Sequence, residues 1–169
     1  MIPSPLVWVL AAVVLTRLIE MNVAEVNTGR LRADGWREVG ARHYPLFILL
    51  HGSLIVATAL TTPLDQPPVW PLVAVLVALQ ALRFWTIGSL GRQWTTRIFT
   101  RDDVPLRRNG PYRYLRHPAY VVIALEVAIL PLTFVNWLVA LVWSTLNALL
   151  LVHRIRVEDA AIAARRALD

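Results

Sequence analysis

Residues 120–152 read YVVIALEVAILPLTFVNWLVALVWSTLNALLLV, an apolar run that is long enough to indicate the architecture of the chain. It is too long for one membrane-spanning helix, which takes about 20 residues, and too short for two such helices joined by a long loop. Pro131 and residues 133–136 interrupt the run near its middle, where proline removes a helical hydrogen bond. The run therefore predicts a tight helical hairpin with arms over residues 120–130 and 137–152.

Three further apolar runs precede the hairpin, over about residues 2–19, 44–61 and 69–87. The first is long enough to span a membrane if Arg17 snorkels at its end. It lacks the basic n-region and cleavage site of a signal peptide, so we expect it to be retained. The chain is 57% hydrophobic and 17% charged, whereas soluble domains are about 25% charged. The sequence therefore predicts an all-α integral membrane protein, a single domain over residues 1–169 with five transmembrane helices.

All 17 basic residues are arginines, and the predicted loops share them unequally. The segments between the first and second spans, between the third and fourth, and after the fifth are rich in arginine, whereas the loop 63–68 and the hairpin bend have none. Cytoplasmic loops carry such an excess of positive charge. We therefore expect the N-terminus outside and the C-terminus in the cytoplasm of a bacterial plasma membrane. Membrane topology thus accounts for the net charge of +6, and no nucleic acid is expected as a partner.

The remaining ionisable residues limit the possible chemistry. The chain has no cysteine, which excludes disulfides and a cysteine nucleophile, and its four histidines lack the spacing of metal ligands, so no metal site is expected. Glu126 lies inside a predicted span, where an acid is a functional-site hypothesis, and we expect it to contact a substrate hydroxyl or to pair with Arg83. His51 is expected to form an interhelical hydrogen bond, with the lining of an acceptor tunnel as the alternative. His43 and Tyr44 are expected to anchor the chain at the interface.

The segment before the hairpin, residues 109–120, reads NGPYRYLRHPAY. Gly110-Pro111 marks a turn, and Pro118 suits the first turn of a helix, where its missing N–H costs nothing. His117 is then expected at the N-cap, beside backbone N–H groups that favour an anion. The segment is either an aromatic and arginine belt at the membrane interface or a ligand site.

A second polar cluster, residues 153–159 (HRIRVED), follows the fifth span. Arg154 and Glu158 are four residues apart and share one face of a helix. They are either an ion pair at a solvated helix end or a guanidinium and a carboxylate that face a zwitterionic ligand. Both clusters are expected on the cytoplasmic side of the same hairpin, which favours the ligand site.

The motif GPYRYLRHPAY at residues 110–120, the apolar hairpin and the motif RIRVED at residues 154–159 together resemble the isoprenylcysteine carboxyl methyltransferase family. The resemblance covers roughly residues 80–162. Residues 40–44 (GARHY) and 126–131 (EVAILP) are similar to a bacterial subgroup of that family, which includes alkylpyrone and alkylresorcinol O-methyltransferases.

The resemblance implies a membrane methyltransferase with a cytoplasmic site for S-adenosylmethionine, a lipophilic small-molecule acceptor and surrounding membrane lipids. Aromatic rings are suited to adenine or to the sulfonium, a cation at residue 116 or 117 to the carboxylate of the donor, and Glu158 to its ammonium or ribose. Arg154 is expected to orient the acceptor oxygen, and His117 to take the proton of a phenol. The cofactor-binding residues that the resemblance implies are Trp94, Tyr112, Tyr114, Leu115, Arg116, His117, Pro118, Tyr120 and Glu158, and the catalytic residues are Arg154, Glu126 and His117.

The chain also departs from the family pattern. Residues 102–106 stand where many members carry a histidine, and Asp159 stands where a second glutamate is usual. The resemblance favours a ring hydroxyl of an alkylpyrone or alkylresorcinol as the acceptor. Alternatives are carboxyl methylation of a prenylated cysteine, phospholipid N-methylation, a membrane reductase with a similar C-terminal hairpin, and a scaffold without catalytic activity.

Overall fold

The computed structural model describes residues 4–166 and 168, which form five long helices and several short elements. The long helices are α1 (Pro5–Ala33), α2 (Tyr44–Thr61), α3 (Trp70–Leu90), α4 (Pro118–Leu132) and α5 (Trp137–Ala161). A proline lies in the first turn of each of the first four, where its missing N–H costs no helical hydrogen bond. The short elements are β1 (Arg37–Val39), β2 (Ile98–Thr100), the 3₁₀ turns η1 (Ala41–His43), η2 (Gly91–Gln93) and η3 (Gly110–Arg113), and α6 (Ala163–Arg166).

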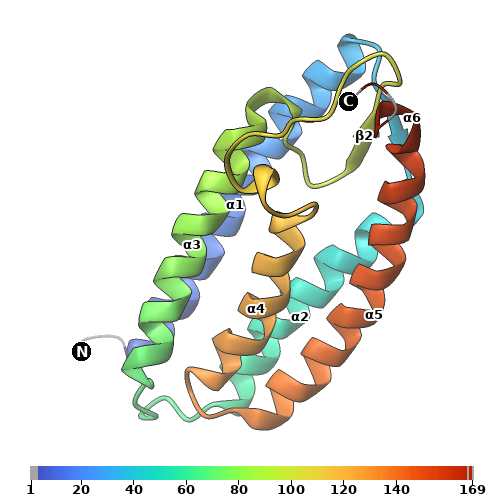
Figure 1. Ribbon diagram of the computed structural model, residues 1–169. Coiled ribbons are helices and arrows are strands. Elements are labelled where there is room, and N and C mark those ends of the chain that lie inside the picture. The colour runs from blue at the N-terminus through green and yellow to red at the C-terminus, as the bar shows by residue number, and fades with distance from the viewer. Residues whose placement is uncertain (1–3, 167, 169) are drawn as a thin grey trace.

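Successive long helices run in alternating directions, which gives the bundle two distinct ends (Figure 1). One of them, which we call the basic end, holds residues 34–43, 91–117 and 162–166, where most of the arginines outside the apolar runs lie. The other end holds the connections 62–69 and 133–136, which contain no arginine. The arginine-rich segments that were predicted to share one side of a membrane therefore do lie together.

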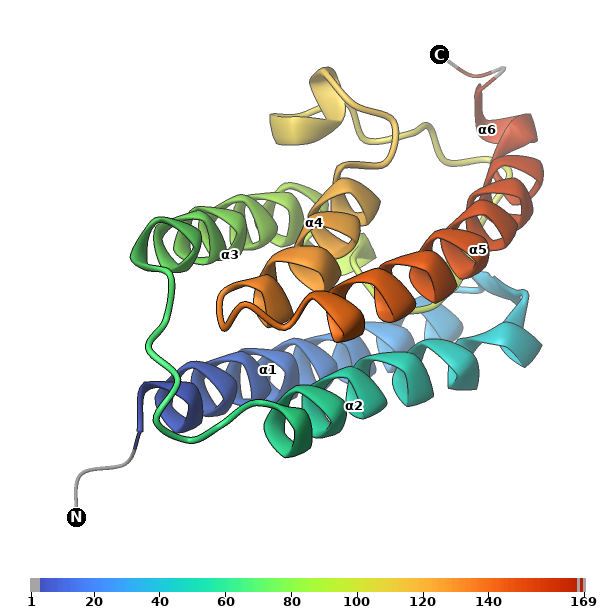
Figure 2. The same cartoon turned by 90° about the horizontal axis from the view of Figure 1, so that it is seen from below.

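The arrangement of the helices around one another is clearest in the view from below (Figure 2). α4 packs between α3 and α5, while α1 and α2 lie side by side. Within the described residues, four helical segments are long and apolar enough to cross a membrane, namely α1, α5, α2 together with η1, and α3 together with η2. α4 is apolar but has only 15 residues, fewer than the approximately 20 that a full span takes. A fifth crossing by α4 stays a prediction.

The first long helix extends well beyond the first predicted span. That span was predicted over about residues 2–19 and stays a prediction, whereas α1 continues to Ala33 and the chain leaves the helix at Gly35, where φ is +78°. Charged residues lower the hydropathy, but Glu and Arg are good helix formers, and residues 20–33 contain no proline that would end the helix. Arg17 consequently lies in the middle of α1 and does not snorkel at a helix end.

The all-α prediction also missed a small antiparallel sheet. Its strands pair Arg37 with Thr100 and Val39 with Ile98. The segment that precedes α2 and the segment that follows α3 therefore meet at the basic end. Strands of three residues joined by such a distant connection leave no periodic pattern in the sequence.

The connection between α4 and α5 is a tight turn over residues 133–136. Pro131 lies inside α4, and the chain reverses at Val135, where φ is +59°. Asn136 caps α5 by accepting a hydrogen bond from the Val139 N–H at 3.3 Å. The Asn136 side chain also donates to the Thr61 hydroxyl at 2.8 Å, which holds the turn against the end of α2.

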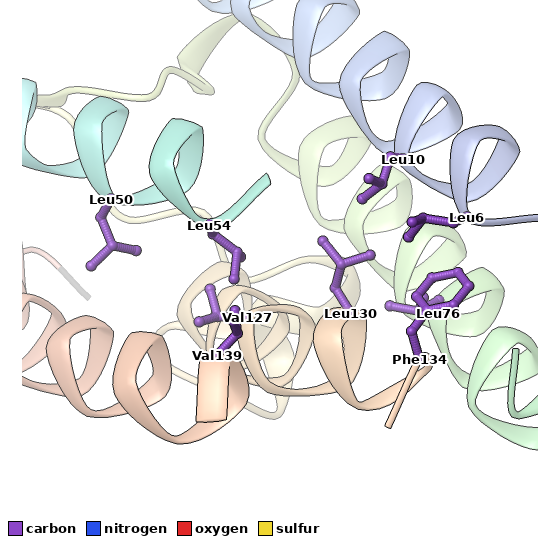
Figure 3. Close-up of a cluster of buried hydrophobic side chains, with 9 residues drawn as sticks. All are labelled: Leu6, Leu10, Leu50, Leu54, Leu76, Val127, Leu130, Phe134 and Val139. Carbon is purple, nitrogen blue, oxygen red and sulfur yellow. The ribbon is translucent and has the colours of Figure 1, made fainter. Parts of the chain in front are cut away.

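A cluster of buried apolar side chains joins all five long helices (Figure 3). It takes residues from the beginnings of α1, α3 and α5, from the end of α4 and from the middle of α2. Its members are Leu6, Leu10, Leu50, Leu54, Leu76, Val127, Leu130, Phe134 and Val139. The helices are thus held together by apolar packing in this cluster.

Candidate functional site

The segment before α4 is fixed to α3 by its glycine and its asparagine. Gly110 has a φ of +56°, and a Cβ atom there would collide with the side chain of Ser89. The Asn109 amide donates to the Ser89 carbonyl at 3.0 Å. These contacts place η3 against α3 and leave Tyr112 facing inward, where burial, followed by the charge of Glu158, raises the pKa of its phenol.

His117 lies at the N-cap of α4, as the sequence predicts. Its Nε2 is 3.0 Å from the Asp159 carboxylate, and its ring stacks on that of Tyr120 with the ring centres 5.4 Å apart. Its Nδ1 is 3.9 Å from the carboxylate of Glu158. Asp159 also forms an ion pair with Arg166, so α5 and α6 both help to set the orientation of the imidazole.

Arg154 and Glu158 share one face of α5, and Tyr120 of α4 bridges them. The Tyr120 hydroxyl donates to the Glu158 carboxylate and accepts a hydrogen bond from Arg154 Nε at 2.8 Å. Arg154 Nη2 donates to the Thr96 carbonyl at 2.6 Å, and the guanidinium lies 5.0 Å from the centre of the Phe47 ring. Four separate parts of the chain thus meet at this guanidinium.

A cavity of about 750 Å³ runs from this polar group into the bundle. Its volume lies within the range of about 300–1,000 Å³ typical of small-molecule sites. At the basic end it is lined by Tyr112, His117, Tyr120, Arg154 and Glu158, and farther in by apolar side chains. Those apolar side chains include Val14, Leu18, Met21, Ile48, Ile55, Ile87, Leu90 and Ile123.

The cavity brings together most of the residues predicted for the site. Besides the five at its polar end, it is lined by Trp94, Tyr114, Leu115 and Arg116. Of these Trp94 is buried, whereas the Tyr114 side chain is largely exposed. Pro118 and Glu126 do not line this cavity; Pro118 begins α4, and Glu126 faces a smaller neighbouring cavity.

Glu126 belongs to a cluster of ionisable side chains inside the helical bundle. Its carboxylate accepts from Gln80 at 2.6 Å, from Arg17 at 3.2 Å and from Arg83, which binds it through both Nε and Nη2. Arg83 also donates to Glu20 at 3.2 Å. The predicted pairing of Glu126 with Arg83 is therefore observed, and its predicted contact with a substrate stays a prediction.

Sequence reasoning missed several residues that the structure places at the cavity. Glu20 and Arg17 line it from α1, although the rule that marks an ionisable residue in a membrane span applies to both of them. Tyr44 was expected only to anchor the chain at the interface, but it lines the cavity and its hydroxyl is 2.9 Å from the Thr96 hydroxyl. His51 bonds within its own helix, to the Phe47 carbonyl at 2.8 Å, and lines the cavity, which agrees with the alternative prediction.

Comparison with protein-family models identifies the family of this chain. Residues 72–164, more than half of the chain, match the model of the isoprenylcysteine carboxyl methyltransferase (ICMT) family. The chain belongs to this family. The ICMT match covers α3 to α5, and with them Tyr112, His117, Tyr120, Arg154 and Glu158.

Relatives resemble this chain over nearly its whole length. "Uncharacterized protein YpbQ" of Bacillus subtilis (strain 168) is 37% identical over 92% of this chain and 95% of its own length. An "Uncharacterized protein" of Haemophilus influenzae is 25% identical over 90% of this chain and 92% of its own length. No solved structure matches the chain. ICMT enzymes are methyltransferases that use S-adenosylmethionine, and membership together with the apolar helices makes this chain a membrane methyltransferase.

Proposed function

We propose that this protein transfers a methyl group from S-adenosylmethionine to an oxygen atom of a lipophilic acceptor at the membrane interface. The observation that carries the proposal is the single cavity that joins the polar groups of the basic end to apolar side chains of α1, α2 and α3. A polar donor and an apolar acceptor need such a junction if they are to meet inside one water-excluding site.

The residues at the polar end fit the donor. Glu158 supplies a carboxylate for an ammonium or for ribose hydroxyls, and Arg116 supplies a cation for a carboxylate. Tyr112 and Trp94 supply aromatic faces for adenine or for a sulfonium cation. S-adenosylmethionine, when bound, supplies an electrophilic methyl group.

The chain's own residues position the acceptor and receive its proton. Because a carboxylate only accepts hydrogen bonds, the 3.0 Å contact with Asp159 places the proton of a neutral His117 on Nε2 and leaves the lone pair on Nδ1. That lone pair can take the proton of a ring hydroxyl. Arg154, held by Tyr120 and Thr96, orients the acceptor oxygen, and the apolar lining excludes water.

We favour a ring hydroxyl, as in an alkylpyrone or alkylresorcinol, over the carboxylate of a prenylated cysteine. A carboxylate acceptor needs no base, whereas a phenol does. His117, which is hydrogen-bonded to Asp159, can act as that base. One observation favours the second candidate, because the Arg154 guanidinium at the polar end would also bind a carboxylate.

The experiment uses protein purified in detergent. We expect calorimetry to detect binding of S-adenosylmethionine and none of NADPH, which would be the ligand of a reductase. We then expect methyl transfer from labelled S-adenosylmethionine to long-chain alkylpyrone or alkylresorcinol, and little transfer to a farnesylcysteine analogue. Transfer to farnesylcysteine alone would replace the ring hydroxyl with a carboxylate, and NADPH binding without methyl transfer would contradict the whole proposal.

We also propose that the basic end faces the cytoplasm, because cytoplasmic loops carry the excess of arginine. The chain has no cysteine, so single cysteines can be introduced as labels. We expect an impermeant thiol reagent to label an Asp65→Cys variant in intact cells, and to label an Arg107→Cys variant only after the cells are opened. Both positions are exposed, at opposite ends of the bundle. Labelling at residue 107 but not at residue 65 in intact cells would reverse this orientation.

A further inference from the structure

Glu20 has a carboxylate oxygen that the rest of the described chain does not use. The side chain is 5% exposed, and its Oε2 accepts hydrogen bonds from Arg17 at 2.7 Å and from Arg83 at 3.2 Å. Its Oε1 is buried and accepts a hydrogen bond from none of the described residues. Glu20 also lines the large cavity.

A buried carboxylate oxygen without a donor is costly, and more so inside an apolar bundle than at a protein surface. A hydrogen-bond donor is therefore expected to reach Glu20 Oε1 when a ligand fills the cavity. Because Glu20 lies in the middle of α1, about 20 Å along the helix from either of its ends, a donor must come from a molecule that enters the bundle.

The position of this oxygen separates it from the polar end of the cavity. Glu126, which shares Arg83 with Glu20, lies six residues beyond Tyr120 on α4, or about 9 Å farther along the helix axis. The Glu20 oxygen therefore serves a different part of the occupant from the part that meets Tyr120, Arg154 and Glu158.

The charges of Arg17, Arg83, Glu20 and Glu126 determine which kind of hydrogen-bond donor can approach Glu20 Oε1. Two guanidiniums, those of Arg17 and Arg83, face two carboxylates, those of Glu20 and Glu126, so the cluster is electrically balanced. An anionic group there would be repelled by Glu20, and a cationic group would be repelled by the two arginines. A neutral hydroxyl donates a hydrogen bond and adds no charge.

We propose that Glu20 Oε1 accepts a hydrogen bond from a second hydroxyl of the methyl acceptor, one that is not itself methylated in that binding mode. This inference rests on the proposed function and deepens it, since it describes the acceptor as a neutral, long-chain ring compound with two hydroxyls. One hydroxyl is the methyl acceptor at the polar end, and the other is held by Glu20.

The test compares two ligands of equal chain length, an alkylresorcinol with two ring hydroxyls and a meta-alkylphenol with one. Binding to the purified protein is measured by calorimetry without S-adenosylmethionine. We expect the wild-type protein to bind the alkylresorcinol about 10- to 100-fold more tightly, as befits a hydrogen bond to a charged group.

A Glu20→Gln variant is expected to lose most of this preference, because a hydroxyl can only accept from the new amide NH₂ and that neutral hydrogen bond is weaker than one to a carboxylate. Arginine only donates hydrogen bonds, so the amide oxygen turns toward Arg17 and Arg83 and the amide NH₂, a donor, takes the place of Oε1. The matched control is Glu25→Gln, the same change at an exposed carboxylate of the same helix, and it is expected to keep the full preference.

Equal affinity of the wild-type protein for the two ligands would overturn the proposal and leave a water molecule as the donor to Oε1. An unchanged preference in Glu20→Gln would overturn it as well. If that variant does not fold, the comparison of the two ligands on the wild-type protein still decides. Methyl transfer is measured separately, so selective binding without transfer would refute the proposed reaction while leaving the recognition by Glu20 in place.

Discussion

The Glu158→Ala variant is expected to lose about 100-fold or more of the affinity for S-adenosylmethionine, and its methyl transfer with it. The Glu158 carboxylate lies at the polar end of the cavity and accepts a hydrogen bond from the Tyr120 hydroxyl. That hydroxyl in turn accepts a hydrogen bond from Arg154. The substitution removes a charged partner of the donor and also frees two side chains that position the acceptor. Calorimetry measures the first effect and a labelled-methyl assay measures the second.

A His117→Ala variant tests the two roles assigned to this residue, which are binding of S-adenosylmethionine and acceptance of the proton of the ring hydroxyl. It removes the ring that stacks on Tyr120 and binds Asp159, and with it the proposed proton acceptor. A matched control is Asp65→Ala, which removes an exposed carboxylate at the opposite end of the bundle and should change neither measurement. Unchanged cofactor affinity and turnover in both Glu158→Ala and His117→Ala would remove these two residues from the site.

An Arg83→Leu variant is expected to be destabilised by about 3–5 kcal/mol, which corresponds to a fall of about 10 °C in the melting temperature. Arg83 is 8% exposed and binds both Glu20 and Glu126, so its loss leaves two buried carboxylates with Arg17 as their charged partner. Thermal unfolding in detergent, followed by size-exclusion chromatography, measures the change. The control is Arg92→Leu, which alters an exposed arginine just beyond the end of α3.

A double variant shows whether charge imbalance causes this loss. Arg83→Leu combined with Glu126→Leu leaves Arg17 and Glu20, whose 2.7 Å ion pair is balanced. Replacing a buried ion pair by apolar residues is often neutral, so the double variant should recover much of the lost stability. A double variant less stable than Arg83→Leu alone would mean that the packing of these side chains, and not their charge, holds the cluster together.

The local features of the fold could be predicted from the sequence because they depend on neighbouring residues. Proline in the first turn of α4, the turn before Asn136 and the N-cap position of His117 follow from rules that act over a few residues. The shared face of Arg154 and Glu158 follows from helical periodicity. These features were predicted in place.

The parts that were missed depend on contacts between distant segments. The β1–β2 pairing, the bond from Arg154 to the Thr96 carbonyl and the contact of His117 with Asp159 each join segments that only the tertiary fold brings together. Arg17 was misread for a related reason, because its partner Glu126 is supplied by another helix. A hydropathy profile registers such an arginine only as the end of an apolar run.

The long first helix has a consequence for how this enzyme could acquire new acceptors. The family match begins at residue 72, yet α1 and α2 form one side of the cavity with Leu18, Glu20, Phe47 and His51. The proposed donor-binding groups thus lie within the matched stretch, whereas a large part of the proposed acceptor side comes from helices that precede it. Substitutions in the first two helices can reshape the pocket for a different lipid tail or ring while the groups assigned to methyl donation stay as they are.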